Sequence, residues 1–204
     1  MGEIDGSKRA LRESILAVRA RLTARDAEAT ATVLAERALE LPELTEARTV
    51  AAYVSVGREP GTGPLLEALR AQGVRVLLPV LLPDNDLDWA VYEGTAGLVR
   101  ARRGLLEPGG PRLGPDAVTE ADAVLLPGLA VDGDGIRLGR GGGSYDRVLA
   151  RIGAAGARPA LAVLLYDAEV VGSVPAEPHD LPVAAAVTPS AVHRFTPPPP
   201  PHHA

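Results

Sequence analysis

Residues 49–80 read TVAAYVSVGREPGTGPLLEALRAQGVRVLLPV, in which a capped helical segment separates two apolar runs. The run 49–56, with its Val and Tyr residues, predicts a buried strand. Residues 62–71 predict a helix, which Gly73 is expected to close. The run 74–80 predicts a second strand. Strand, helix and strand in this order are typical of two parallel strands joined by a crossover helix, so the sequence predicts a parallel sheet.

The sequence on either side of this unit extends the same alternation. Before it, we expect two helices, one over residues 6–22 and one from Thr23, as N-cap, to Leu41, where Pro42 stops it. After it, the stretch 93–120 is rich in Gly, Pro and Arg and predicts long connections with little regular structure. The other expected elements are strands over 87–92, 123–131, 160–165 and 183–187, and a helix over 144–152. Together they predict a three-layer α/β protein with a mainly parallel central sheet flanked by helices.

Composition narrows the classes of function. The chain has 204 residues, 46% of them hydrophobic, which suits one globular domain. The formal net charge of −5 gives no bulk basic field for nucleic acid, so an anionic ligand needs a local cluster of cations. The chain has no Cys, which excludes thiolate nucleophiles, disulfides and zinc–thiolate sites. Only four His are present, so a His-rich metal site is not expected.

No part of the sequence indicates a membrane protein. No apolar run approaches the roughly 20 residues that a membrane span needs, and the first residues lack the apolar core of a signal peptide. We therefore expect a cytoplasmic monomer that binds neither membrane nor nucleic acid. Residues 1–194 are expected to form a single domain. Residues 195–204, rich in Pro and His, predict a disordered tail.

The first expected helix carries two stripes. The apolar stripe consists of Leu11, Ile15, Val18 and Leu22. Lys8, Arg12 and Arg19 form a basic stripe about 70° round the helix, which places their cations at the edge of the surface on which the helix packs. Without further information, a basic stripe of this kind is usually a solvated helix face.

The most informative loop is residues 133–143, GDGIRLGRGGG, which follows the strongest apolar run and opens a helix. Glycines let backbone N–H groups approach phosphate oxygens, and a helix N-terminus favours negative charge. Arg137, Arg140 and Arg147 add charged donors. The loop is neither a Walker A sequence nor a full dinucleotide fingerprint. A flexible surface loop is the alternative, but the interleaved Arg and Gly residues favour phosphate binding.

Three carboxylates are candidates for chemistry. Asp146 falls in the first turn of a helix, where it complements the helix dipole or holds Mg²⁺ beside phosphates. Glu59 lies at the carboxyl end of a predicted parallel strand, where open α/β sheets bind ligands, although an exposed turn carboxylate is the simpler interpretation. His179-Asp180 forms a loop pair, and for His179 a capping or turn role is favoured.

Several motifs in one order resemble the 5-formyltetrahydrofolate cyclo-ligase family, also called methenyltetrahydrofolate synthetases. The resemblance extends from Lys8 to about Pro189. Its motifs are Lys8-x-x-x-Arg12, YVSVGREPGT at 53–62, LPV at 78–80, LDWA at 87–90, GLLEP at 104–108, LPGLAVD at 126–132, RLGRGGGSYDR at 137–147 and VPAEPHD at 174–180. The resemblance implies the three-layer fold of the sugar-phosphate isomerases and CoA-transferases. It also implies ATP-dependent conversion of 5-formyltetrahydrofolate to 5,10-methenyltetrahydrofolate, with release of ADP and phosphate.

The resemblance also implies roles by position. It assigns ATP contacts to Lys8, Arg9, Ala10, Leu11, Arg12, Arg137, Leu138, Gly139, Arg140, Gly141, Gly142, Gly143, Ser144 and Tyr145. It assigns the folate to Val54, Glu59, Arg140, Gly141, Gly142, Gly143 and Ser144, to which we add Trp89 and Tyr92 as flat surfaces for the pterin. Mg²⁺ is assigned to Asp146 and Asp180, and the charge-neutralising catalytic role to Arg137 and Arg140.

One position departs from the family pattern. The family usually has two tyrosines before this aspartate, whereas here the first is Ser144, which keeps a hydroxyl but loses an aromatic surface. This departure concerns the folate contact rather than the phosphate loop. Two other functions stay open: a sugar-phosphate isomerase-like enzyme on the same scaffold, and a non-catalytic nucleotide- or folate-binding protein.

Overall fold

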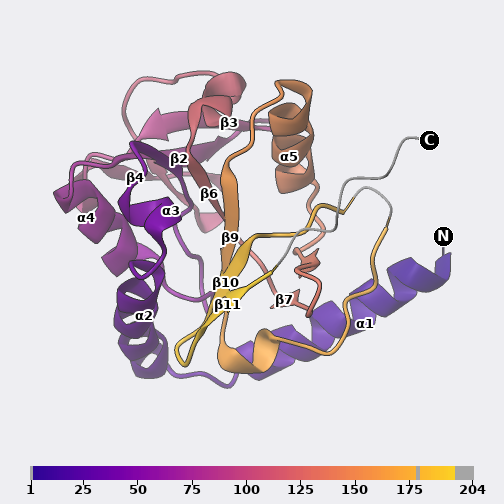
Figure 1. Cartoon of the computed structure of the whole chain (residues 1–204). Helices are drawn as coiled ribbons and strands as arrows, with labels where there is room; N and C mark the ends of the chain where they lie inside the picture. The colour runs from indigo at the N-terminus through magenta and orange to yellow at the C-terminus, as the bar shows by residue number, and fades with distance from the viewer. Residues whose placement is uncertain (1, 178–179, 196–204) are drawn as a thin grey trace.

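The computed structural model describes residues 2–177 and 180–195, and its centre is a seven-stranded sheet (Figure 1). The strand order is β11-β10-β9-β6-β1-β2-β3. The five inner strands run parallel, and the edge strands β3 and β11 are antiparallel to their neighbours. The strands are β1 Thr49–Ala51, β2 Arg75–Leu81, β3 Leu87–Val91, β6 Ala123–Leu126, β9 Ala160–Leu164, β10 Ala185–Val187 and β11 Val192–Arg194. The prediction of a mainly parallel central sheet is thereby confirmed.

Helices cover both faces of this sheet. Helices α2 (Ala24–Ala38), α3 (Pro42–Thr45) and α4 (Gly63–Ala71) share one core with alternate residues of the central strands, including Val50 and Val76. The opposite face packs on α5 (Ser144–Ala154) and the short helix η3 (Pro115–Glu120). Because side chains alternate across a strand, each parallel strand contributes to both cores, and the expected three layers are present.

Helix α1 (Gly2–Arg19) packs apart from these layers (Figure 1), against the two-stranded hairpin β7 (Ala130–Val131) and β8 (Arg137–Leu138). Of the predicted apolar stripe, Ile15 is buried and Leu11 packs against the same hydrophobic cluster, whereas Val18 departs from the prediction. Val18 is 52% exposed, whereas Arg19 is 2% exposed. The helix turns its basic stripe inward because Arg19 finds a buried carboxylate, as described below.

Two predicted strands end early. The run 123–131 divides into β6 and β7 because Pro127 has no N–H to continue the ladder. A Cβ on the next residue, Gly128, would lie 2.6 Å from Val163. The run 49–56 stops being a strand after Ala51. Past these strand ends, Tyr53, Val54 and Pro127 line a cavity instead of extending the sheet.

Other element boundaries also differ from expectation. Thr23 caps α2 in a reciprocal capping box with Asp26, as predicted. However, α2 ends at Ala38, and Pro42 opens α3. Pro has a fixed φ that suits the first helical position, so it starts a helix here as well as stopping one.

The stretch 93–120 holds more structure than expected. It contains the antiparallel hairpin β4 (Leu98–Arg100) and β5 (Leu106–Pro108) and the short helices η1 (Thr95–Gly97), η2 (Arg102–Gly104) and η3. A further short helix, η4 (Asp167–Glu169), follows β9. No helix among the described residues is long and apolar enough to span a membrane. Of the predicted tail, only Phe195 is described; it packs against the α5 side of the sheet, and residues 196–204 lie outside the described residues.

Candidate functional site

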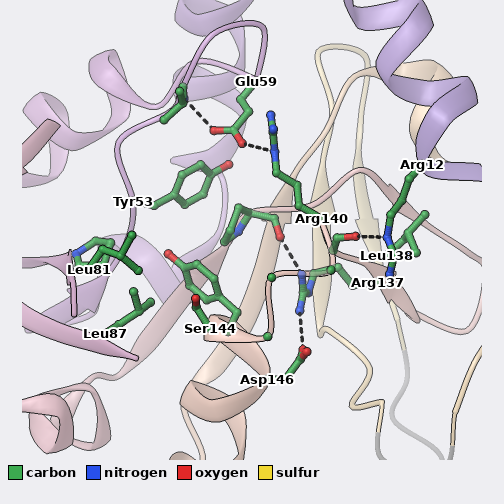
Figure 2. A pocket seen from close by; sticks show the side chains of 18 of the residues that line it. Arg12, Tyr53, Glu59, Leu81, Leu87, Arg137, Leu138, Arg140, Ser144 and Asp146 are labelled. Carbon is green, nitrogen blue, oxygen red and sulfur yellow. Dashed lines mark hydrogen bonds and ion pairs between the residues drawn. The ribbon is translucent and has the colours of Figure 1, made fainter. Parts of the chain in front are cut away.

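A cavity of about 500 Å³ opens at the carboxyl ends of the parallel strands (Figure 2). Segments that follow β1, end β2 and follow β6 contribute to its wall, for example Val54, Leu81 and Pro127. Strand ends of a doubly covered parallel sheet are where ligands bind, because loops there leave backbone groups unpaired. The cavity is also lined by α1, by the hairpin β4–β5 and by the whole segment 137–146.

The segment 137–146 forms one wall and leads into the N-terminus of α5. Gly143 precedes the helix with φ 75°, and no side chain caps it. Gly141 has φ 84°, and a Cβ there would lie 3.2 Å from the Arg12 guanidinium carbon. Glycine is therefore needed both for the backbone conformation and for close approach. The N–H groups of an uncapped helix N-terminus and a glycine loop form an anion site at this wall.

The side chain of Arg137, the first residue of this segment, is buried. Its side chain is 8% exposed, donates to the Pro127 carbonyl at 2.8 Å and lies 3.9 Å from the Asp146 carboxylate. Burial lowers the pKa of Arg137, against the opposing effect of Asp146. A buried guanidinium without a close, fully engaged carboxylate is prepared for an anionic ligand.

Two side chains of α1 reach the cavity. Arg12 donates to the Gly139 carbonyl at 3.0 Å and thus holds the loop against the helix. Lys8 is buried and pairs with Glu177 at 2.9 Å and with Asp180 at 2.8 Å. Burial acts to lower the pKa of Lys8, but its bonds to these two carboxylates outweigh burial, and the pKa lies above its usual value.

Arg140 and Glu59 join two walls of the cavity (Figure 2). The Arg140 Nε lies 2.9 Å from Glu59 Oε1, and the other Glu59 oxygen accepts the Val56 N–H at 2.7 Å. Glu59 is therefore oriented by its own turn, with its side chain 9% exposed, whereas the Arg140 side chain is 52% exposed. A loop guanidinium that is mostly exposed can leave this pair and turn to a ligand.

The position of α1 depends on a buried ion pair. Arg19 binds Glu169 of η4 through both carboxylate oxygens, at 2.6 and 2.8 Å, and donates to the Gly128 carbonyl at 2.8 Å. Its guanidinium also lies 5.6 Å from the centre of the Tyr166 ring. These contacts fix the end of α1 on the segments after β6 and β9, so they set where the other α1 cations lie.

Apolar and aromatic side chains line the side of the cavity opposite Arg12. Figure 2 shows Leu81 and Leu87 on this side, with Tyr53 between them and Arg140. Tyr145 also lines the cavity, and its hydroxyl has no hydrogen-bond partner among the described residues. Burial raises the pKa of both Tyr53 and Tyr145, so both phenols stay neutral. The Tyr145 hydroxyl is itself buried, so it is an unpaired polar atom within the wall rather than a group exposed to the cavity.

Most residues predicted for the site lie in this cavity wall, and five do not. Lys8, Arg12, Val54, Glu59, Asp180 and all of 137–146 line it. Arg9 and Ala10 are exposed on the outer side of α1, and Leu11 packs against the hydrophobic cluster between α1 and the hairpin β7–β8.

Trp89 is 0% exposed inside the core, and Tyr92 is buried and donates to Glu67. Neither residue lines the cavity, because Trp89 packs in the core on the α5 side of the sheet and Tyr92 in the core on the opposite side, so we leave both out of the site. His179 lies outside the described residues.

The carboxylates present suit Mg²⁺ as a partial ligand set. Asp146 and Asp180 both line the cavity and offer oxygen ligands, which Mg²⁺ prefers. Among residues 2–177 and 180–195, no cluster of three or more His, Asp or Glu side chains could hold a metal alone. Mg²⁺ usually takes one or two carboxylates together with phosphate oxygens and water. Asp146 and Asp180 are therefore candidates for such a partial ligand set.

Sequence reasoning missed part of the wall. Tyr53, Pro79, Leu81 and Leu87 line the cavity, as do Arg103 and residues 105–107 of the hairpin. The first four stand near strand ends, which is a usable signal once a parallel sheet is expected. The hairpin left no such signal, because its strands have three residues each.

Comparisons with known proteins agree on one family. The model described as "5-formyltetrahydrofolate cyclo-ligase family" matches residues 4–189. A 5-formyltetrahydrofolate cyclo-ligase of Mycolicibacterium smegmatis is 46% identical over 148 residues, which cover 70% of this chain and 74% of that protein. A protein of the same name from Escherichia coli strain K12 is 36% identical over 160 residues, covering 78% of this chain and 87% of its own.

A solved structure is similar over almost the full length. The NMR structure of the 5,10-methenyltetrahydrofolate synthetase of Aquifex aeolicus superposes with a TM-score of 0.78 at 27% sequence identity. The match covers 97% of this chain and 99% of that one. The similarity therefore includes both the sheet and the segments that line the cavity.

Proposed function

Because the chain belongs to the 5-formyltetrahydrofolate cyclo-ligase family, we propose that its cavity binds ATP and 5-formyltetrahydrofolate together and closes the folate ring at the expense of ATP. The resemblance inferred from the motifs is confirmed, as is the class of enzyme, a ligase that forms a C–N bond. The observation that carries the proposal is that one cavity has an anion-binding wall and an apolar wall. ATP, Mg²⁺ and the individual residue roles belong to the proposal.

The nucleotide phosphates lie against the segment 137–143 and the N-terminus of α5. Arg12 and Arg137 neutralise phosphate charge from two sides of this loop, and Lys8 adds a third cation from α1. Arg140 leaves Glu59 to contact the transferring phosphoryl group. Such chemistry needs mainly positioning and charge neutralisation, and it requires no nucleophilic side chain of the protein.

The folate lies against the apolar wall. Val54, Leu81 and Leu87 contact its flat rings, while Glu59 hydrogen-bonds the pterin edge. Ser144 occurs where the family usually has a tyrosine, yet Tyr53 and Tyr145 still give this wall two aromatic rings. The folate contact is thus carried by neighbours of Ser144.

Mg²⁺ would be held by Asp146 and Asp180 together with phosphate oxygens, and when bound it would neutralise part of the charge on the phosphates. The protein's own residues prepare that position. Lys8 and the Glu177 N–H both donate to Asp180 Oδ2 at 2.8 Å, which orients the carboxylate. Asp146 is held near Arg137 at the first turn of α5.

The reaction then balances in two steps. The formyl oxygen attacks the γ-phosphorus, and the bond from phosphorus to the β-bridging oxygen breaks, which releases ADP. N10 attacks the formyl carbon and loses its proton, and the C–O bond breaks with release of phosphate and formation of the N5–CH–N10 bridge. Arg137 and Arg140 stabilise charge on the phosphoryl group in the first step.

The purified protein tests this proposal directly. Mixed with 5-formyltetrahydrofolate, Mg²⁺ and ATP, it should produce the methenyl chromophore and equimolar ADP. Product without ATP, or binding of both ligands without product, would remove the proposed reaction. A phosphosugar isomerisation with no ATP requirement would favour the isomerase-like alternative.

The cellular setting belongs to the same proposal. We place the enzyme in the cytoplasm as a monomer, with residues 1–194 as its single domain. A sequence without cysteine does not depend on an oxidising compartment, which supports this placement. Size-exclusion chromatography with light scattering would check the monomer.

A further inference from the structure

Asp132 carries a buried carboxylate that the proposed reaction does not use. It ends the motif 126–132, lies in the turn between β7 and β8 and is 5% exposed. Within the described part of the chain, it forms no ion pair with an Arg or Lys side chain. A buried carboxylate without a cation is costly unless hydrogen bonds satisfy its oxygens, so the partners of these oxygens indicate what the residue does.

All hydrogen bonds printed for this carboxylate come from backbone N–H groups, and they reach two separate segments. Its Oδ1 accepts from Asp134 at 3.1 Å and from Ile136 at 3.0 Å, which closes the turn before the phosphate loop, residues 137–143. Its Oδ2 accepts the Val174 N–H at 2.9 Å, at the start of the segment that carries Asp180. One carboxylate therefore joins the approach to the phosphate loop with a segment that reaches the cavity from elsewhere.

The same hairpin also holds this segment at further points. The Gly135 carbonyl accepts the Val183 N–H at 2.9 Å, and the Val131 carbonyl accepts the Val171 N–H at 2.8 Å. Gly135 has φ 79°, and a Cβ there would lie 2.7 Å from the Val183 carbonyl oxygen, so glycine is needed both for the turn and for the close approach. The chain that carries Asp180 is thus anchored on the hairpin β7–β8 both before and after that residue.

The two segments joined in this way present the two proposed metal ligands. At the phosphate loop, Asp146 lies 3.9 Å from the Arg137 guanidinium (Figure 2). On the other segment, Asp180 Oδ2 accepts from Lys8 and from the Glu177 N–H, each at 2.8 Å. Mg²⁺ tolerates little variation in the positions of its oxygen ligands. The turn at the tip of β7–β8 therefore controls whether carboxylates from both segments suit one ion.

We propose that Asp132 is a positioning residue of the ATP site, which holds the phosphate loop and Asp180 in one arrangement so that both bind a complex of nucleotide and Mg²⁺. The inference rests on the proposed function, because that function assigns the metal to Asp180. Asp132 does not line the cavity, so it acts through the backbone of the two segments and not by contact with a ligand.

The Asp132→Asn variant separates the two connections. Its single carbonyl oxygen can keep both N–H groups of the turn, which retains two bonds of three. The new NH2 group then faces the Val174 N–H, and two donors cannot bond. The phosphate loop should therefore keep its shape, whereas the segment with Asp180 loses its anchor.

Isothermal titration with adenylyl imidodiphosphate, a non-hydrolysable ATP analogue, measures this difference. In Mg²⁺, the Kd of Asp132→Asn should rise about 10-fold above that of the wild type, the lower limit typical of residues that support a metal ligand from outside. In EDTA, the Kd should stay within about 2-fold of the wild type. Val174→Pro removes the same hydrogen bond from the donor side and should give the same result.

A double variant tests whether Asp132 acts through Asp180. If it does, Asp132→Asn/Asp180→Asn should bind the analogue in Mg²⁺ within about 2-fold of Asp180→Asn alone. Asp122→Asn is the matched control. Asp122 accepts the Arg48 and Thr49 N–H groups at 2.8 and 2.9 Å, but it precedes β6 at the amino end of the sheet, outside the cavity. Both Kd values of this control should stay within about 2-fold of the wild type.

The outcomes separate the two proposals. If the wild type forms methenyl product and Asp132→Asn keeps its Kd in Mg²⁺, the inference alone is overturned. Equal losses in EDTA and Mg²⁺ would assign Asp132 to the shape of the phosphate loop, and additive losses in the double variant would separate it from Asp180. Failure of both Asp132→Asn and Val174→Pro to fold would make its role structural. Each of these three results also overturns the inference. Wild-type protein that forms no methenyl product, or that binds the analogue equally well in EDTA and Mg²⁺, would refute the proposed function, and this inference with it.

Discussion

The two sides of the cavity are built in opposite ways. The anionic-ligand side comes from one contiguous segment, 137–146, supported by two cations of α1. The apolar side comes from separate pieces: the segment after β1, the end of β2, the start of β3 and the hairpin β4–β5. Binding phosphate needs donors at fixed spacing, whereas binding a flat ring needs only apolar surface, which many segments can supply. The residues of one side of such a site are therefore neighbours in sequence. Those of the other side are distant in sequence, and only the fold brings them together.

The largest expected effect concerns how α1 is held against the anionic side. Arg19→Met should reduce the free energy of unfolding by about 3–5 kcal/mol, because Glu169 would stay buried without its cation. In the fraction that folds, KM for ATP should rise more than KM for folate. Urea denaturation and kinetics measure both quantities.

Two further variants make this result specific. Arg19→Met/Glu169→Met removes both charges and should recover most of the lost stability. Arg37→Met breaks an exposed pair with Glu40 and should cost no more than about 0.5 kcal/mol. A loss below about 1 kcal/mol for Arg19→Met would contradict the assigned role of the buried pair.

The next effect concerns the phosphate loop itself. Arg140→Ala should lower kcat/KM about 100- to 1000-fold, the loss typical of removing one donor that stabilises charge in the transition state. The fold should persist, because the side chain is mostly exposed, and circular dichroism would check this. Arg147→Ala is the comparison variant: Arg147 donates to the Asp84 carbonyl outside the cavity, so its activity should fall less than about 3-fold. Equal losses in the two variants would refute the role given to Arg140.

A smaller effect is expected on the apolar side. Leu81→Asn should raise KM for folate roughly 10-fold, because part of a ring loses its apolar contact, and it should leave KM for ATP unchanged. Leu113→Asn changes an exposed leucine outside the cavity and serves as the control. If Leu81→Asn raised both KM values equally, the division of the cavity into two sides would be wrong.

The smallest effect is a predicted lack of pH dependence at Lys8. Its folded-state pKa is raised above the usual 10.5 by its two carboxylate partners. A raised pKa contributes stability that is fully present below the unfolded pKa and is lost as pH rises through the folded pKa. Lys8 should therefore stay charged from pH 7 to 9, and the ratio of ATP affinities between wild type and Lys8→Met should stay constant over that range. A ratio that falls toward one by pH 9 would contradict the pairing.

The sequence predicted most of the fold for a physical reason. Strands and helices that alternate along a chain almost dictate a parallel sheet with helices on both faces. Predictions from the sequence were wrong where the type of a residue does not determine whether it is buried in the core or exposed. Trp89 looked like a ligand surface, but on an antiparallel edge strand beside η3 it is a core residue. Arg19 looked like the edge of a solvated stripe, but a partner 150 residues away in sequence buries it.

The residues of the candidate site also divide into those that the sequence could predict and those that it could not. Arg137, Arg140 and the glycines between them could be found because their pattern is local. Leu105 and Leu106 of the hairpin could not, because strands of three residues leave no periodic pattern. Tyr53 and Leu87 stand near predicted strand ends, which is a usable signal only once a parallel sheet is expected. The apolar run 123–131 shows the difficulty most plainly, since only Pro127 marks where the strand ends and the cavity begins.

The central claim is that both walls act on one reaction, in which the formyl oxygen receives the γ-phosphoryl group of ATP. The most direct measurement uses 5-formyltetrahydrofolate labelled with ¹⁸O in the formyl group and follows the label by mass spectrometry of the released phosphate. The account predicts one ¹⁸O atom in each phosphate, formed together with one ADP and one methenyl product. Unlabelled phosphate, or methenyl product without ADP, would contradict it.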